Sequence, residues 1–415
     1  MTKVSIITLG CKLNKYESDC MSRILEENGY FTSSKLEFAD IYILNTCGVT
    51  AESEKKSRQY IAKFSKLNPN AKIIVCGCAS QNNISQFLDK PNVYSVFGNE
   101  DKKDILKYIN KSYKQITEFS DKYNSIYCPK ITTTRAYMKV QDGCNNFCSY
   151  CLIPYLRGRT RSREISDCVK EAYQLSKVAK EIVLTGIDLS SFSPSLGELM
   201  LALKDIPSRI RIGSLEVGVI TNDFLKILSS LTNFCPQFHL SLQSGDNEVL
   251  RRMNRHYTRE EYKSKVDLIR KYFPDANITT DIIVGFACET EDEFLNTLDF
   301  VKEINFGHVH VFPYSVRKGT AASKLYKDLP MNLKKERVDR LEEVARISED
   351  KYIESQIGKI HEVLTEEIED DGVVGYTANY LKVTLPKNTP LNKLVKVKLL
   401  SRQENTLYGD ILEVL

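Results

Sequence analysis

The first hundred residues alternate short apolar runs with amphipathic segments. The apolar runs cover residues 3–10, 40–47, 71–78 and 93–98. Continuous runs of this length are typical of parallel strands that are buried on both faces. The segments 15–29 and 53–67 have the period of amphipathic helices, and Gly29 and Pro69 mark where they stop. Repeated strand–helix alternation predicts a doubly wound α/β domain over residues 1–125.

The alternation resumes after a polar segment, residues 111–134, which we interpret as a linker. Six further strand candidates occupy residues 136–143, 181–188, 209–217, 238–244, 278–286 and 308–315. Helical patterns such as 290–304 separate them. Six consecutive βα units predict an incomplete (β/α)6 barrel over residues 130–345 rather than a second open sheet.

The pattern changes again near the carboxyl end. The charged segment 332–356 predicts a connecting helix. Short strand candidates with Gly and Asn turns then follow at residues 360–368, 373–385, 394–400 and 406–415. This change of period predicts a small all-β barrel over residues 350–415, and therefore a mixed α/β protein of three domains.

Composition narrows the class of protein. The chain has 415 residues, of which 42% are hydrophobic and 27% charged, and no apolar run approaches the length of a membrane span. Its twelve cysteines occur without an evident secretory signal, so we expect reduced thiols that serve metal binding or catalysis in the cytoplasm. A net charge of +4 is too small to indicate a polyanionic partner by itself.

Three cysteines, Cys144, Cys148 and Cys151, follow the first predicted barrel strand in the stretch "QDGCNNFCSYC". This places them at the carboxyl end of a strand, where βα barrels carry their chemistry. A structural zinc site would normally use two C-x2–4-C or H-x3–5-H pairs, and the first histidine in the chain is His239. Three thiolates without a fourth nearby favour an iron–sulfur cubane with one iron open to a small-molecule ligand.

A second set of cysteines is dispersed along the chain. Cys11, Cys47 and Cys78 each follow a different predicted strand of the first domain. If those strands are parallel, their carboxyl ends share one sheet edge, where open α/β sheets bind ligands. The pattern alone fits a metal site and three unrelated thiols equally well. The other cysteines have no mutual spacing, and we interpret them as small buried residues: Cys20, Cys76, Cys128, Cys168, Cys235 and Cys288.

The C-x3-C-x-aromatic-C arrangement, with Tyr150 in the aromatic position, resembles the signature of radical S-adenosylmethionine enzymes. In those enzymes the open iron chelates S-adenosylmethionine. The order of "TLGCKLNKYES", "NTCGVT", "CGCASQ" and "CNNFCSYCLIPYLRGRTRSRE" is similar to the methylthiotransferase family among them. The resemblance implies a second cluster in the N-terminal domain, held by Cys11, Cys47 and Cys78. It also implies a C-terminal RNA-binding barrel of the TRAM type, for which "VVGYTANYLKVTL" is the main support.

The resemblance also implies the chemistry. An unactivated C–H would be replaced by C–S–CH3, which a general base cannot achieve at neutral pH, so a radical cofactor is needed. The Cys144/Cys148/Cys151 cluster would pass one electron to S-adenosylmethionine, and the resulting 5′-deoxyadenosyl radical would abstract hydrogen. The second cluster would deliver sulfur, and a second S-adenosylmethionine would methylate it. We expect two [4Fe–4S] clusters, an electron donor such as flavodoxin or ferredoxin, and a monomer with no membrane contact.

Further candidates lie at predicted strand ends of the barrel. By resemblance, the cosubstrate region contains Gln243, Ser244 and Arg255, and Glu216 is a further candidate. Gly186 and Gly285 would permit close backbone approach to the cosubstrate, with ordinary turn glycines as the alternative. The stretch "GFACET" has Ala287–Cys288 where the family usually has Pro-Gly, which affects the expected loop shape. His308 and His310 share a strand face without a third partner, and we interpret them as ordinarily buried.

Basic residues provide the expected RNA contacts. The segment "RGRTRSR" directly follows the cysteine loop and carries Arg157, Arg159, Arg161 and Arg163. Arginines beside an active site suit bidentate contacts with phosphate. In the last domain Lys393, Lys396 and Lys398 predict a basic face for backbone phosphates, and Tyr376 and Tyr380 are either base-stacking residues or barrel core.

Family members modify an adenosine beside the tRNA anticodon or an aspartate of a ribosomal protein. "GCKLNKYES", with Lys12 after the first cysteine, and "RGRTRSR" most resemble the branch that acts on N6-threonylcarbamoyladenosine at position 37 of tRNA. The alternatives are the N6-isopentenyladenosine branch, the aspartate branch, and a non-catalytic iron–sulfur RNA-binding protein. A threonylcarbamoyl group carries a carboxylate and a hydroxyl, so its pocket should hold cationic or hydrogen-bonding groups. We expect these groups from residues 157–163 or from Arg317, which follows the sixth barrel strand.

Overall fold

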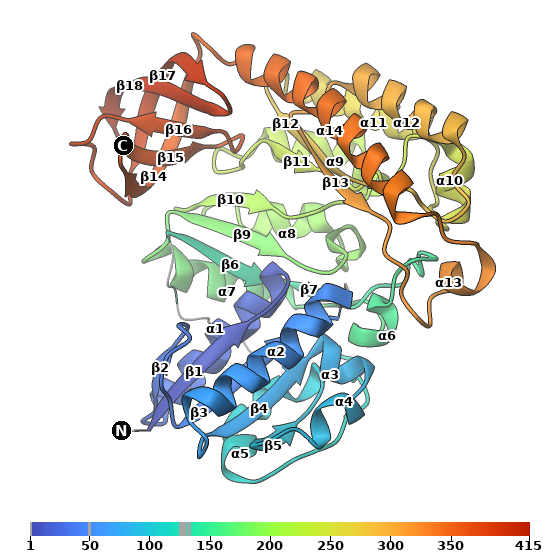
Figure 1. Ribbon diagram of the computed structural model, residues 1–415. Helices are drawn as coiled ribbons and strands as arrows, with labels where there is room; N and C mark the ends of the chain where they lie inside the picture. The colour runs from blue at the N-terminus through green and yellow to red at the C-terminus, as the bar shows by residue number, and fades with distance from the viewer. Residues whose placement is uncertain (1, 49–50, 124–130, 132–133) are drawn as a thin grey trace.

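The computed structural model describes residues 2–48, 51–123, 131 and 134–415. Cys128 lies outside the described residues. Along the chain, an N-terminal α/β unit is followed by a larger α/β unit and then by a small β-barrel (Figure 1).

The N-terminal unit is built on a five-stranded sheet whose paired strands are all parallel. Its strands lie in the order β2 (Phe31–Ser33), β1 (Lys3–Thr8), β3 (Ile41–Thr46), β4 (Lys72–Gly77) and β5 (Val93–Val96). Its helices are α1 (Lys12–Glu27), α2 (Ala51–Leu67), α3 (Cys78–Asn82), α4 (Ser85–Leu88) and α5 (Ile105–Asn110), with a 3-10 turn at Glu100–Asp104. Separate apolar clusters cover the two sheet faces, so the continuous apolar runs are buried on both sides. The four predicted strands are confirmed. β2 was not predicted, because three residues are too few to show a period.

The central unit contains the six predicted parallel strands. They are β6 (Arg135–Lys139), β9 (Glu181–Thr185), β10 (Arg209–Ile212), β11 (Gln237–His239), β12 (Asn277–Val284) and β13 (His308–Pro313). β6, β9 and β10 form one sheet and β11, β12 and β13 another. Parallel bridges at Ile210–Phe234 and Leu215–Leu240 join the two sheets. The strands therefore form one curved row that starts at β6 and ends at β13 (Figure 1).

Helices cover the outer face of these six strands. They are α7 (Ile165–Ser176), α8 (Leu196–Ala202), α9 (Asn222–Ser229), α11 (Arg259–Tyr272), α12 (Glu291–Ile304) and α14 (Met331–Glu354). α11 and α12 both begin with a capping box, in which the helix's third residue and its N-cap threonine satisfy each other's backbone N–H groups. One large apolar cluster fills the space between strands and helices. Shorter elements occupy the strand ends: β7 (Gln141–Asp142), α6 (Ile153–Arg157), β8 (Arg161–Ser162), α10 (Asn247–Arg252), α13 (Ala321–Leu325) and 3-10 turns at Leu189–Ser191 and Val217–Val219.

The C-terminal unit is a closed β-barrel, which confirms the predicted change to all-β structure. Its strands are β14 (Ile360–Glu369), β15 (Gly372–Thr377), β16 (Lys382–Leu385), β17 (Leu394–Gln403) and β18 (Thr406–Val414), in the order β14-β15-β16-β18-β17. The predicted strand 373–385 is two strands, separated by a turn in which Tyr380 has a positive φ of 67°.

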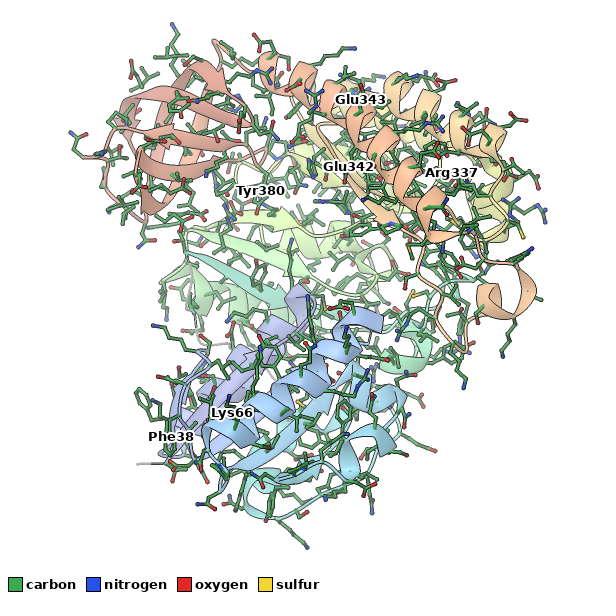
Figure 2. All side chains as sticks on the ribbon, viewed as in Figure 1. Phe38, Lys66, Arg337, Glu342, Glu343 and Tyr380 are labelled. Carbon is green, nitrogen blue, oxygen red and sulfur yellow. The ribbon has the colours of Figure 1, made fainter. Side chains whose placement is uncertain are left out.

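That turn packs against the central unit. Tyr376 and Tyr380 stack on each other with ring centres 5.1 Å apart, and the Arg135 guanidinium lies over both rings. Arg211 donates to the Ala378 carbonyl oxygen at 2.9 Å. Figure 2 shows Tyr380 between the C-terminal barrel and the central strands. The two tyrosines thus join two units of the protein.

Candidate active site

The loop that carries Cys144, Cys148 and Cys151 lies between β7 and α6, at the carboxyl end of β6. The backbone N–H two residues after Cys144 and after Cys151 donates to the sulfur of that cysteine, in both cases at 3.4 Å. The third sulfur, that of Cys148, lies 3.2 Å from Nη1 of Arg255. N–H groups directed at each sulfur stabilise thiolates, and such hydrogen bonds tune the sulfurs of iron–sulfur clusters.

The chemistry of these thiols tests whether an iron–sulfur group fits. Burial raises the pKa of Cys144 to about 11 and that of Cys151 to about 12, so a bound cation is needed to keep them deprotonated at neutral pH. A single tetrahedral ion would need its ligand atoms close together. Among the described residues, neither cysteine triplet has its three sulfurs all within 4.8 Å of one another. The donor set therefore fits a polynuclear cluster better than one zinc ion.

The second triplet meets at the carboxyl edge of the N-terminal sheet. Cys11 precedes α1, Cys47 follows β3, and Cys78 opens α3. A methyl group on Gly10 would lie 2.7 Å from the Cys47 sulfur, and one on Gly48 would lie 3.0 Å from the Cys78 backbone. Glycine at these two positions thus lets the three cysteine-bearing loops come together.

Helix α6 connects the two cysteine regions, because it begins two residues after Cys151 and packs on the N-terminal unit. Asn99 donates to the Leu156 carbonyl oxygen of α6 at 2.8 Å, and its side-chain nitrogen lies 3.5 Å from the Cys78 sulfur. One short helix therefore lies against both thiol sets.

A buried network of charges fixes this junction. The Glu17 carboxylate of α1 accepts from Lys139 of β6 at 2.7 Å and from Arg157 of α6 at 2.8 Å, and it also pairs with Lys102. Asp142 accepts from Lys139 at 2.6 Å. Burial acts to raise the pKa of Glu17, but the three cations together hold it well below its usual range. Each carboxylate of the network pairs with at least two cations, which is how charges are tolerated in a protein interior.

The network changes the interpretation of "RGRTRSR". Arg157 is fully buried, Arg161 pairs with Glu100 at 3.2 Å, and Arg163 pairs with Glu171 at 2.6 Å. Phosphate contact therefore does not fit these three arginines, because buried carboxylates already occupy them. Arg159 is exposed and lies 4.4 Å above the Phe147 ring, beside the cysteine loop.

Arg317 also differs from expectation. Its Nη2 donates to the Gly48 carbonyl oxygen at 2.8 Å and to Glu54 of α2 at 2.7 Å, and its side chain is 9% exposed. Arg317 thus connects the central barrel to the loop after Cys47. Its Nη2 already has protein partners, so it does not fit the expected role of a hydrogen-bond donor to the substrate.

A cavity of about 470 Å³ opens beside the Cys144–Cys151 loop. It is lined by the cysteine loop, by the segments that follow β9, β10 and α10, and by α11, and it includes Asn146, Asp188, Glu216, Arg255 and Tyr257. Arg255 pairs with Glu216 at 2.5 Å and also reaches Cys148, so one side chain joins the cavity to the cysteine loop. The volume is within the range of sites for nucleoside-sized ligands. Asn146 and Asp188 were not selected from the sequence, although polar residues after predicted strands were a usable signal.

The other expected cosubstrate residues lie outside the residues that line this cavity. Ser244 is buried and accepts from the backbone N–H of Asp246, so it supports the start of α10. Gln243 joins β11 to β12 through its main chain, and Tyr150 packs against Phe286. A methyl group on Gly186 would meet Gln141 at 2.9 Å.

The loop that departs from the family pattern has a left-handed turn. Gly285 has a φ of +65°, and its N–H donates to Glu289 at 2.8 Å. Cys288 has a φ of 61°, a conformation that glycine adopts without strain and that costs other residues about 1–2 kcal/mol. The substitution in "GFACET" thus preserves the turn with a less suitable residue.

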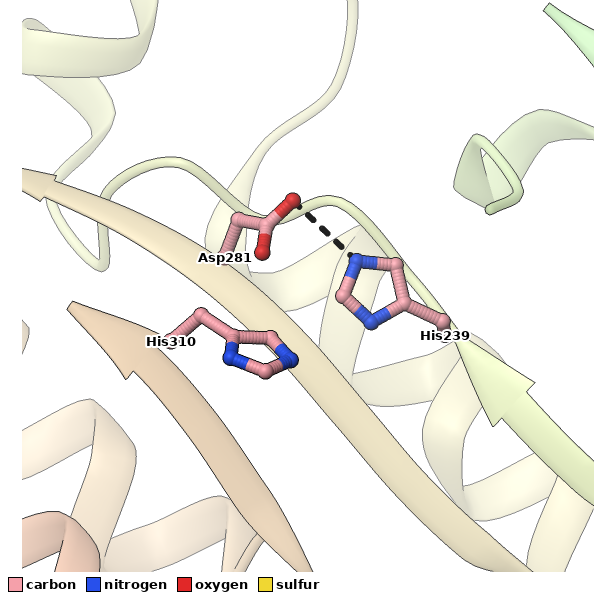
Figure 3. A group of neighbouring side chains, drawn as sticks. All are labelled: His239, Asp281 and His310. Atoms are coloured by element: carbon pink, nitrogen blue, oxygen red, sulfur yellow. Dashed lines mark hydrogen bonds and ion pairs between the residues drawn. The ribbon is translucent and has the colours of Figure 1, made fainter. Parts of the chain in front are cut away.

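His308 and His310 do have partners, contrary to the sequence interpretation. His308 bonds Glu349 at 3.0 Å. His310 is exposed and forms a compact group with His239 and Asp281, whose ligand atoms all lie within 4.8 Å of one another (Figure 3). Strand register brings these residues together, and a single sequence does not reveal it.

Comparison with known proteins agrees with this fold and site. The family models for the uncharacterized protein family UPF0004 and the radical SAM superfamily match residues 3–98 and 138–301. A solved radical S-adenosylmethionine methyltransferase from Kitasatospora setae superposes with a TM-score of 0.58 at 13% identity, over 78% of this chain and 77% of that one. Fold and cysteine loop thus define a radical S-adenosylmethionine protein, with S-adenosylmethionine and an iron–sulfur cluster as its cofactors.

Full-length relatives narrow the class. The chain is 37% identical to a threonylcarbamoyladenosine tRNA methylthiotransferase of Bacillus subtilis, over 96% of this chain and 94% of the relative. It is 36% identical to the protein of the same name from Aquifex aeolicus, over 95% and 99%. It is 34% identical to a tRNA-2-methylthio-N(6)-dimethylallyladenosine synthase of Clostridium botulinum, over 98% and 96%. The chain belongs to the tRNA methylthiotransferase family of radical S-adenosylmethionine enzymes. Within the described residues, no helix has the length and apolar character needed to cross a bilayer.

Proposed function

We propose that this enzyme converts N6-threonylcarbamoyladenosine at position 37 of tRNA to its 2-methylthio derivative. The observation that carries the proposal is the full-length similarity to five relatives named for that substrate, at 33–38% identity. Two thiol triplets, both in contact with α6, support it, because sulfur insertion needs a sulfur-carrying site close to the radical site.

The proposed cofactor arrangement follows the two triplets. Cys144, Cys148 and Cys151 hold one [4Fe–4S] cluster, and Cys11, Cys47 and Cys78 hold a second. The cavity with Glu216 and Arg255 takes S-adenosylmethionine. When bound, these groups supply one-electron chemistry at an unactivated carbon, which no amino-acid side chain provides.

The chain's own contribution is positioning. Arg255 contacts Cys148, Glu216 and the Tyr257 hydroxyl, which itself lies 2.7 Å from the Ser241 carbonyl oxygen. This set of contacts fixes one guanidinium between the cysteine loop and the cavity. The buried Glu17 network holds the other triplet at a set position, so the two centres keep a constant relation.

We further propose three domains, at residues 1–125, 130–345 and 350–415, of which the last is a TRAM-like module that binds tRNA. Lys396 and Lys398 are exposed on β17, and Lys393, directly before this strand, is exposed as well. Lys396 pairs in register with Glu413 and Lys398 with Asp410, which moderates the positive charge of this face. Arg159, beside the cysteine loop, is a second contact. An electron donor such as flavodoxin or ferredoxin, a monomeric state and a cytoplasmic location complete the proposal.

The RNA contact has a direct test in the salt dependence of tRNA binding. Replacing Lys393, Lys396 and Lys398 together with Gln should change the slope of log binding constant against log salt concentration. The steepness of this slope should fall by about 0.7–0.9 for each lost phosphate contact. An unchanged slope would mean that the three lysines only face solvent.

The substrate is tested with purified, anaerobically reconstituted enzyme and nucleoside mass spectrometry. One tRNA carries threonylcarbamoyladenosine and an otherwise identical tRNA carries isopentenyladenosine. We expect the methylthio product from the first tRNA and almost none from the second. Equal turnover, or preference for the isopentenyl form, would overturn the substrate assignment and leave the family membership intact.

A further inference from the structure

Three polar side chains meet on the inner face of the central strands, and the proposed chemistry does not use them. They are His239 at the end of β11, Asp281 of β12 and His310 of β13 (Figure 3). Along each strand, a direct neighbour of the polar residue is buried in the apolar cluster beneath the helices. Because successive side chains of a strand point to opposite faces, the three polar side chains lie on the inner face.

Strand register brings these side chains to one point. Asp281 pairs directly with His310, and His239 pairs with Thr279, which is two residues before Asp281. Each member of the group offers one ligand atom, and these atoms all lie within 4.8 Å of one another. Three adjacent parallel strands thus present two imidazoles and one carboxylate to a common centre.

The distances within the group suit a bound metal ion. His239 Nε2 lies 3.1 Å from an Asp281 carboxylate oxygen. Two ligand atoms that are each about 2.0–2.1 Å from a tetrahedral ion lie about 3.3 Å apart, so this pair can hold an ion after a shift of a few tenths of an ångström. The His310 ring is exposed, and its side chain is therefore able to rotate toward the same centre.

The outer contacts of the group also suit ligation. His239 Nδ1 lies 2.9 Å from the Thr279 hydroxyl. Histidines that ligate metals generally donate their other ring N–H to a neighbouring oxygen, and this contact leaves the Nε2 lone pair directed at the common centre. Neither the His310 ring nor the second carboxylate oxygen of Asp281 has a hydrogen-bond partner among the residues that the structure describes. These donor atoms are therefore available to an ion.

The donor set selects a class of metal. Imidazoles suit zinc and the other late first-row transition metals, whereas calcium and magnesium prefer shells made of oxygen atoms alone. Three protein ligands with an exposed histidine leave at least one coordination position for water. The group contains no thiol, so its ligands differ in kind from those of both cysteine triplets.

We propose that His239, Asp281 and His310 bind one divalent transition-metal ion, of which zinc fits the donor set best. This mononuclear site is separate from both cysteine triplets, and none of its three ligands lines the cavity beside the cysteine loop. The ion links β11 and β12 to β13, which is the last strand of its sheet. The site does not depend on which tRNA the enzyme modifies.

The test measures zinc binding by full-length enzyme that has been reconstituted anaerobically with iron and sulfide, so that the cysteines are occupied. Zinc is the probe because such a site binds Zn²⁺ more tightly than Fe²⁺, and because its X-ray absorption edge is distinct from that of iron. Equilibrium dialysis should show about one zinc per chain. The zinc edge spectrum should show nitrogen and oxygen ligands at about 2.0–2.2 Å and no sulfur at about 2.3 Å.

Two substitutions remove single ligands. His310→Gln and Asp281→Asn should each raise the zinc dissociation constant by at least about tenfold, because losing even an outer-shell partner of a metal ligand costs 10–100-fold in affinity. His361→Gln is the control, since this histidine lies on β14 in the C-terminal barrel and should leave the constant unchanged.

The variants are compared with the wild type at equal iron content and equal circular dichroism. If one ligand variant does not fold, the other decides. An unchanged dissociation constant in either folded ligand variant would overturn the site. Sulfur in the zinc shell of the wild type, or no zinc bound beyond that held by His310→Gln, would overturn it as well.

Discussion

The two cysteine triplets lie against the same helix but are assembled in different ways. Cys144, Cys148 and Cys151 occupy one loop, and their sulfurs receive N–H groups from within that loop and from Arg255. Cys11, Cys47 and Cys78 come from three loops that only a parallel sheet brings together. The first arrangement is local and the second depends on the register of three strands.

This difference suggests that metal binding by the two triplets responds differently to changes in the packing of the protein. A local triplet should remain able to bind metal when distant packing changes. A convergent triplet should depend on whatever holds the sheet edge against α6, which here includes Asn99 and the Glu17 network. The following predictions test this comparison, beginning with the largest expected effect.

Replacing Cys144, Cys148 and Cys151 with Ala should abolish formation of 5′-deoxyadenosine from S-adenosylmethionine. About four of about eight irons should be lost, because the variant removes the ligands of only one of the two clusters that we propose. The measurements are iron content after anaerobic reconstitution and chromatography of the nucleoside product. Unchanged iron in the triple variant would disprove the assignment of this loop.

Replacing Cys11, Cys47 or Cys78 singly with Ala should abolish the methylthio product and retain 5′-deoxyadenosine formation. The reason is that, in the function we propose, this triplet serves sulfur delivery and not radical generation. Liquid chromatography–mass spectrometry of both products checks the split. Cys20→Ala and Cys235→Ala are the controls, since both thiols are buried away from the two sets and should keep both activities.

Arg157→Met should destabilise the junction between α1 and α6 by about 3–5 kcal/mol, because it leaves Glu17 and Asp142 short of a buried cation. Arg159→Met, two residues on, removes an exposed charge and should change stability by less than about 0.5 kcal/mol. Denaturant unfolding followed by circular dichroism compares them. We also expect Arg157→Met to reduce formation of the methylthio product more than it reduces formation of 5′-deoxyadenosine. A larger reduction of 5′-deoxyadenosine formation would contradict the dependence of the convergent triplet on this network.

Cys288→Gly should keep all iron and both products, because this cysteine belongs to neither triplet. It should raise stability by about 0.5–1 kcal/mol, since glycine relieves a left-handed conformation at a modest entropic cost. Thermal unfolding of the reconstituted protein measures the gain. Loss of iron in this variant would add a further cysteine to one of the two sites.

Several features could be predicted from the sequence because they are local. Four of the five strands of the N-terminal sheet and the six strands of the central barrel follow from apolar runs, and the Cys144 loop follows from spacing within eight residues. The parallel arrangement that brings Cys11, Cys47 and Cys78 to one edge also follows from the strand–helix alternation, through the rule that parallel strands share a carboxyl edge.

Other features were decided only by tertiary structure, because their partners are far apart in the chain. The sequence shows Arg157 and Arg161 within a charge run, but buried carboxylates on α1 and on the turn at Glu100 make them structural ion pairs. His239, Asp281 and His310 are dispersed over seventy residues, and strand register alone makes them one group. Sequence patterns report which face of an element is apolar, whereas the partner of a buried charge depends on how separate elements pack.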